Sequence, residues 1–187
     1  MTTLRHRLAT TAVASCVGAT ILLSSLPAGA HEAPGAHAHT AAPSKDTVKT
    51  VRRATKQYRD PALAIADGFV ATDACSEHPE LGGMGFHYVN PARIMDPAIA
   101  AAEPEVLLYE PTQDGGVRLV GVEWFSVDPD QDVTTDEGRP SVLGQAFDGP
   151  MDGHEPGMPV HFDLHLWLYK TNPEGKFSAW NPRVSCD

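Results

Sequence analysis

Apolar and polar side chains alternate with a period of two over residues 160–169. The apolar set is Val160, Phe162, Leu164, Leu166 and Leu168. The other face carries His161, Asp163, His165, Trp167 and Tyr169. A period of two is typical of a strand, so this segment is predicted to be a strand with its His and Asp residues on one face.

Two further β-rich runs, 106–110 and 117–127, are separated by a Pro-Thr-Gln-Asp-Gly-Gly sequence. Gly and Asp between two such runs favour a hairpin. Residues 86–89 read as a short strand, and Gly82-Gly83-Met84-Gly85 before them is predicted to be a loop.

The N-terminal part of the domain has a helical pattern instead. From Ser44, a suitable N-cap, Val48, Val51 and Tyr58 fall on one stripe. Asp60 and Pro61 then begin a second short helix over 61–67, which Gly68 ends. The fold class is therefore predicted to be α+β, with N-terminal helices packed on an antiparallel sheet and long irregular loops over 128–141 and 144–159.

The first 30 residues have the three parts of a secretory signal. Arg5 and Arg7 precede an apolar run, and Ala28-Gly29-Ala30 is a suitable cleavage site. Residues 31–43 form a His-rich tail of small residues, predicted to be flexible, and residues 44–187 form a single globular domain. The segment before Cys16 also resembles a bacterial lipidation signal, so a lipid anchor at Cys16 is the alternative to a secreted, extracellular protein.

The charge and cysteine content limit which partners the protein could bind and which cellular compartment it could occupy. The chain has 14 Lys and Arg against 24 Asp and Glu residues. Because two of the basic residues lie in the signal segment, the remainder carries about −12, which argues against nucleic acid as a partner. No stretch has the length and apolarity of a membrane span. Cys75 and Cys186 are left once Cys16 is removed, and they are expected to form a disulfide in an oxidising compartment.

Histidines and carboxylates of the predicted sheet are the main candidates for chemistry. These residue types bind divalent transition metals. Residues four apart in a strand are about 13 Å apart, so His161 and His165 cannot share an ion there, whereas Asp163 with His165 could. The predicted set is therefore His165 or His161, with His87 and Glu123 from neighbouring strands.

Glu123 is informative because it alternates with Leu119, Gly121 and Phe125 on the predicted inward face. A buried carboxylate requires a partner. That partner is a metal, a histidine, or a basic residue such as Arg93 or Arg183, in which case Glu123 has only a structural role.

Two other metal sites are weaker candidates. Alternating carboxylates resemble the start of a calcium loop at Asp128, Asp130, Asp132 and Asp136. Val133 and Arg139 stand where an EF-hand has Gly and Glu, so the site would be irregular, or the loop is simply solvated. The N-terminal tail offers His31, His37 and His39 for copper, although a tail without rigid support does not favour a fixed catalytic site.

The sequence lacks the motifs of several other enzyme classes. The sequence has no Gly-x-Ser-x-Gly, no His-Glu-x-x-His and no phosphate-binding loop before a helix. Whether the protein is an enzyme stays open at this level.

Four segments resemble a widespread group of secreted actinobacterial and fungal proteins. They are residues 83–91 (GMGFHYVNP), 107–110 (LLYE), 119–124 (LVGVEW) and 164–182 (LHLWLYKTNPEGKFSAWNP). The resemblance covers most of residues 48–187 and omits the tail. It implies that any shared site lies in the sheet, near His87, Glu123 and His165, and it implies no catalytic residues.

Two functional hypotheses follow. The first is a sheet-borne His and carboxylate site for a divalent transition metal, in a hydrolase or an oxidoreductase. The second is a non-catalytic module that binds a small ligand or a cell-wall polymer through exposed Trp124, Trp167 and Trp180.

Overall fold

The computed structural model describes residues 44–155 and 157–187. The predicted signal peptide (1–30), the alternative anchor at Cys16 and the His-rich tail (31–43) lie outside the described residues.

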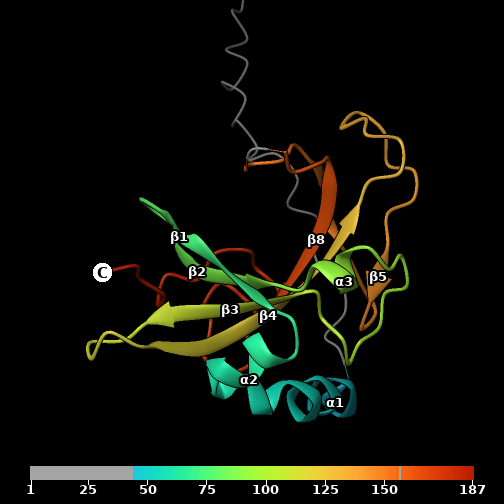
Figure 1. Ribbon diagram of the computed structural model, residues 1–187. Coiled ribbons are helices and arrows are strands. Elements are labelled where there is room, and N and C mark those ends of the chain that lie inside the picture. The colour runs from blue at the N-terminus through green and yellow to red at the C-terminus, as the bar shows by residue number, and fades with distance from the viewer. Residues whose placement is uncertain (1–43, 156) are drawn as a thin grey trace, which may run out of the picture. The chain divides into compact units, whose positions relative to one another are not determined.

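A six-stranded antiparallel sheet dominates the described part of the chain (Figure 1). Its strands, in spatial order, are β1 (Val70–His78), β2 (Gly82–Val89), β3 (Val106–Pro111), β4 (Val117–Val127), β8 (His161–Leu166) and β7 (Asp148–Met151). Each neighbouring pair is antiparallel. Two short strands, β5 (Ser141–Val142) and β6 (Gln145–Ala146), pair separately.

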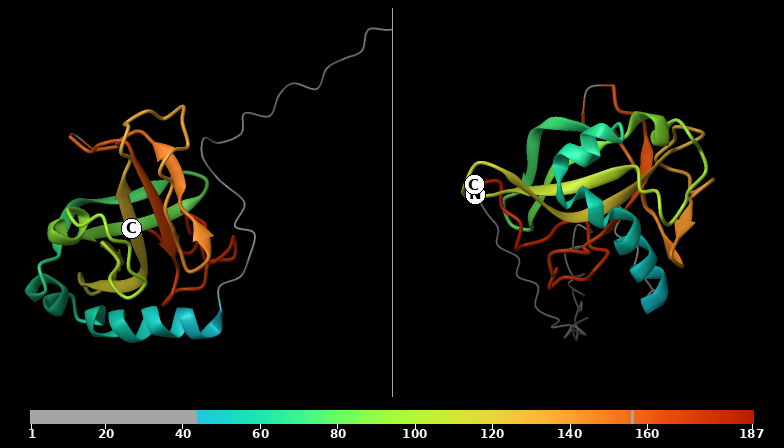
Figure 2. Two further views of the ribbon diagram at one scale, coloured as in Figure 1. Left: turned by 90° about the vertical axis from the view of Figure 1, so that its right-hand side faces the viewer. Right: turned by 60° about the horizontal axis from the view of Figure 1, so that its bottom comes forward.

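Short helices precede the sheet in the chain. They are α1 (Lys45–Thr55), the 3-10 turn η1 (Lys56–Arg59) and α2 (Pro61–Ala66), while α3 (Pro91–Ile94) follows β2. The hydroxyl of Ser44 accepts a hydrogen bond from Thr47 N at 3.1 Å, and the carboxylate of Asp60 accepts one from Ala62 N at 3.0 Å. These caps satisfy orphan amides of the first turn, so the predicted helix starts are confirmed. Figures 1 and 2 show α1 and α2 along the same side of the sheet, with α2 next to β4 and α1 further along.

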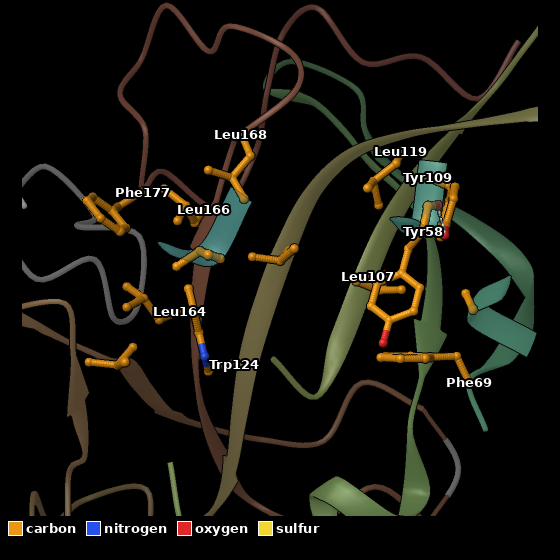
Figure 3. Packing of buried hydrophobic residues seen from close by; sticks show 14 of the residues in the cluster. Tyr58, Phe69, Leu107, Tyr109, Leu119, Trp124, Leu164, Leu166, Leu168 and Phe177 are labelled. Atoms are coloured by element: carbon orange, nitrogen blue, oxygen red, sulfur yellow. Dashed lines mark hydrogen bonds between the residues drawn. The ribbon is translucent and has the colours of Figure 1, made fainter. Parts of the chain in front are cut away.

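The main hydrophobic core lies between the helices and one face of the sheet. Tyr58 and Phe69 pack near Leu107 and Tyr109, and the hydroxyl of Tyr109 donates to Tyr58 O at 2.6 Å (Figure 3). Trp124 is fully buried and donates from its indole to Ala100 O. The helices thus cover one face of the sheet, which confirms the antiparallel sheet with N-terminal helices, although the helices are few and short.

The opposite face of the sheet carries a smaller apolar cluster. Val106, Leu108, Phe125, Trp167 and Val184 are buried there. Met158 of the long loop before β8 packs against the same cluster. This second face also carries the candidate site residues, because side chains alternate between faces along each strand.

The C-terminal segment is fixed to the β1–β2 end of the sheet. A disulfide joins Cys75 and Cys186, with Cα atoms 5.8 Å apart. Gly83 N donates to the carbonyls of Asn181 and Val184 at 3.1 and 3.0 Å. A Cβ on Gly82 would lie 2.3 Å from Asn181 O, so this close backbone approach requires glycine.

The structure corrects the prediction of a loop at 82–85, because these residues begin β2. The glycines there permit close backbone contacts within the sheet. Four strands, β1, β5, β6 and β7, were not predicted, and the last three fall in or beside the segments predicted to be irregular loops. The hairpin of 106–111 and 117–127 and the helix at 61–66 are confirmed. The last strand is confirmed over residues 161–166 and ends before Trp167.

Across residues 44–155 and 157–187, no helix is both long and apolar enough to cross a membrane.

Candidate metal centre

Three strands of the sheet bring one histidine or carboxylate each to a common point. Glu123 on β4 is the direct cross-strand neighbour of His165 on β8. His87 lies on β2, and β3 separates it from β4. His87 pairs with Leu108 of β3 and Glu123 pairs with Val106, so the two side chains meet diagonally across β3.

The donor atoms of these three side chains are at distances suited to one small ion. Glu123 Oε2 lies 3.4 Å from His87 Nε2 and 3.6 Å from His165 Nε2. One ligand atom from each residue can be chosen so that all lie within 4.8 Å of one another. Ligands at about 2.1 Å from a tetrahedral ion are about 3.4 Å apart, so the spacing agrees with metal ligation.

Several polar atoms at this point are buried and make no hydrogen bond within the described chain. They are Glu123 Oε2 and both ring nitrogens of His165. His165 has no exposed surface and Glu123 is 5% exposed. Buried polar groups are nearly always satisfied, and a cation beside His87 Nε2 could bind both Glu123 Oε2 and His165 Nε2.

Without an ion, the electrostatic environment of the cluster favours the protonated forms of Glu123 and His165. Burial raises the pKa of Glu123 to about 8. Burial alone would lower the pKa of His165, but the carboxylates of Glu123 and Asp163 outweigh this effect and raise it to about 9. Burial and the nearby His165 lower the pKa of His87 to about 3. Two of the three ligands therefore hold protons that a cation would displace.

Asp163 lies behind His165 on the same strand rather than among the three converging ligands. Its Oδ1 is 3.7 Å from His165 Nδ1. Burial would raise the pKa of Asp163, but His165 lowers it below its usual value. This separation is longer than a hydrogen bond, so Asp163 acts on His165 through its charge from the side of the ring away from Glu123.

His161 lies apart from the group formed by His87, Glu123 and His165. Its ring stacks on Phe125 with centroids 4.7 Å apart, and its Nδ1 is 3.0 Å from Pro159 O. Of the two histidines proposed from the sequence, it is His165 that joins the cluster. Strand register decides this, and the sequence alone did not give the register.

The acidic loop is arranged by hydrogen bonds within itself. The carboxylate of Asp132 accepts from Thr134 N, and the carboxylate of Asp130 accepts from Asp132 N and the Thr135 hydroxyl. Asp136 pairs with Arg139, while Asp128 is buried. These four do not form a converging ligand group among the described residues, and calcium binding there stays a prediction.

A pocket of about 210 Å³ opens beside the cluster and is lined by His87 and Glu123. Most of its remaining wall is apolar, including Val89, Val106, Phe125 and Met158. This pocket could not be predicted from the sequence, because its wall combines β1, β2, β3, β4, α3 and the loop before β8.

Comparisons with protein-family models, with curated proteins and with solved structures find no match to this chain.

Proposed function

We propose that the protein is an exported metalloprotein in which His87, Glu123 and His165 hold one divalent transition metal ion. The observation that carries the proposal is the convergence of Glu123 Oε2 and His165 Nε2, both buried and without a hydrogen bond in the described chain, with His87 Nε2. Two imidazoles and one carboxylate suit zinc and also non-haem iron(II).

The number of ligands favours a functional site over a purely structural one. Structural zinc sites are almost always closed by four protein ligands, whereas catalytic sites keep one position for water or substrate. Three protein ligands converge here, and two of them line the pocket. The free position therefore supports a role in binding or converting a small molecule at the metal.

The predicted location outside the cytoplasm is part of this proposal. The N-terminal 30 residues read as a signal peptide, and the Cys75–Cys186 disulfide suits an oxidising compartment. The alternative function, a module that presents three tryptophans, receives less support. Trp124 is fully buried and Trp167 is 3% exposed, so neither side chain is available as a surface contact.

Elemental analysis of the protein comprising residues 31–187, purified without a chelator, tests the proposal. We expect about one zinc or iron per chain, retained when residues 31–43 are deleted. Glu123→Gln and His87→Gln should each lower zinc affinity by more than about 100-fold, because each removes a ligand.

His154→Gln is the matched control, since this exposed histidine lines the same pocket but is outside the three-ligand group. It should retain the wild-type metal content. Metal that is lost with the tail, or that survives both ligand substitutions, would show that the ion is held elsewhere.

A further inference from the structure

Strand β1 forms the wall of the pocket that lies opposite His87. Ala71 pairs with Tyr88 and Cys75 with Phe86, so β1 has three residues where β2 has only His87. The extra residues bulge, and Thr72 and Ala74 of this bulge line the pocket. The Thr72 hydroxyl donates to Ala74 O and accepts from His87 N, which fixes the bulge to the ligand strand. Bulges commonly lie next to functional sites.

The composition of the wall selects for apolar ligands. Seven of the thirteen lining residues are apolar, among them Ile94, Phe125 and Met158. The volume of about 210 Å³ exceeds the roughly 150 Å³ of a cavity that binds benzene. A single six-membered ring with one or two substituents therefore fits, whereas a polymer or a fused polycycle does not.

The charges around the pocket select against anions. The ionised carboxylates of Glu123 and Asp163 would balance both charges of a divalent ion. Glu155 adds a further carboxylate to the pocket lining, and the chain as a whole is acidic, with a formal net charge of −10. No excess positive charge is left for an anionic ligand to neutralise.

From this geometry we propose that the pocket binds a small, neutral, single-ring molecule and directs one oxygen of that molecule to the free position on the metal. The apolar wall holds the ring, and His87 and Glu123 lie at the polar end of the pocket, where the oxygen would approach the ion. The inference rests on the proposed metal site and adds the class of ligand.

The test uses 4-fluorophenol, which is neutral at pH 7, observed by fluorine NMR with the zinc-loaded protein. We expect saturable binding that is at least tenfold tighter with zinc than after zinc removal. Benzoate has a ring of the same size but is anionic, and it should bind at least tenfold more weakly than 4-fluorophenol.

Two substitutions fill the pocket without touching a ligand: Ile94→Trp on α3 and Met158→Trp on the loop before β8. Each should abolish binding of the probe while zinc content stays at one per chain. Met95→Trp is the matched control, because this neighbour of Ile94 is 82% exposed and does not line the pocket. Circular dichroism of all variants verifies that they fold.

The outcomes separate the two proposals. Stoichiometric zinc without saturable probe binding, binding that survives both filling substitutions, or tighter binding of benzoate would overturn the ligand assignment and leave the metal site standing. Failure to retain zinc at all would overturn the metal site and the ligand assignment with it.

Discussion

At the residue scale, the proposed metal site separates the groups that would touch the ion from those that would act only through a ligand. Asp163 is 3.7 Å from His165 Nδ1 and does not reach the point where the three ligands meet. Asp163 is therefore not one of the proposed ligands, and it acts on His165 through its charge.

Replacing Asp163 by Asn should weaken zinc binding without removing a ligand. We expect an affinity about 10- to 100-fold lower, which is typical when a carboxylate behind a ligating histidine is lost. Competition with a chromophoric chelator measures the change. Asp114→Asn, on the exposed hairpin turn, is the control and should have no effect. An unchanged affinity for the Asp163 variant would mean that His165 is oriented by packing alone.

Zinc affinity should increase with pH between 6 and 9. The pKa of Glu123 is raised to about 8 and that of His165 to about 9, so both groups are protonated at the lower end and must release protons to bind the ion. His87 contributes little, because its pKa is lowered to about 3. Zinc titrations in chelator buffers should give a slope approaching two protons per ion below pH 8. A zinc affinity that does not change with pH would contradict the assignment of Glu123 and His165 as metal ligands.

The same shifts make the metal-free protein sensitive to alkali. A group whose pKa is raised on folding stabilises the fold below its unfolded pKa, and this stabilisation is lost as pH rises through the folded pKa. Glu123 and His165 both belong to this class. The chelator-treated protein should thus melt at a lower temperature at pH 9 than at pH 7 in calorimetry, and zinc should remove most of the difference. Equal melting temperatures of the metal-free protein at pH 7 and pH 9 would contradict the raised pKa values of Glu123 and His165.

At the scale of single elements, β2 depends on a glycine two residues before a ligand. Gly85 has φ of +89°, and a Cβ there would lie 2.2 Å from Tyr109 O. Gly85→Ala should lower the free energy of unfolding by about 3 kcal/mol or more, since both the backbone conformation and the contact are unfavourable.

Gly115→Ala provides the comparison for this substitution. Gly115 also has positive φ, at +81°, but nothing lies within 4 Å of its would-be Cβ, so the cost should be about 1 kcal/mol. Urea unfolding of both variants measures the difference. Equal costs would mean that β2 shifts away from β3 without penalty.

The sequence predicted those elements whose local pattern agrees with their environment. The β3–β4 hairpin has apolar strands around an Asp-Gly-Gly turn, and β8 alternates regularly, so both were predictable. β1 was not, because most of its residues are exposed or half-buried and it carries a bulge. The glycines of β2 indicate a loop locally, whereas contacts with the C-terminal segment explain Gly82 and Gly83, and a contact with β3 explains Gly85.

The proposed ligands were likewise predictable in part from local pattern and in part only from contacts between distant segments. Glu123 was predictable as a carboxylate on an inward face, and the histidines were predictable from their residue type and strand position. The choice of His165 over His161 depends on the pairing of β8 with β4, and the pocket depends on a bulge. Both arise from contacts between distant segments, which local periodicity cannot specify.

At the scale of the whole molecule, the disulfide closes a loop of 111 residues that includes most of the sheet. In the loop-entropy model, a closure of this length stabilises by about 4 to 5 kcal/mol. The Cys75→Ser, Cys186→Ser double variant should lose about that much in urea unfolding, and reducing agent should have a similar effect on the wild type. A loss below about 1 kcal/mol would mean that the hydrogen bonds of Gly83 hold the C-terminal segment almost alone.

The attachment of the C-terminal segment to β2 also has a consequence for the order in which the protein matures. A ribosome makes His87 early and His165 late, and residues 181–184, which cover Gly82 and Gly83, are made after both. The proposed ligands therefore cannot converge until β8 has been made. A polypeptide that ends before His165 would compete poorly for the proposed ion.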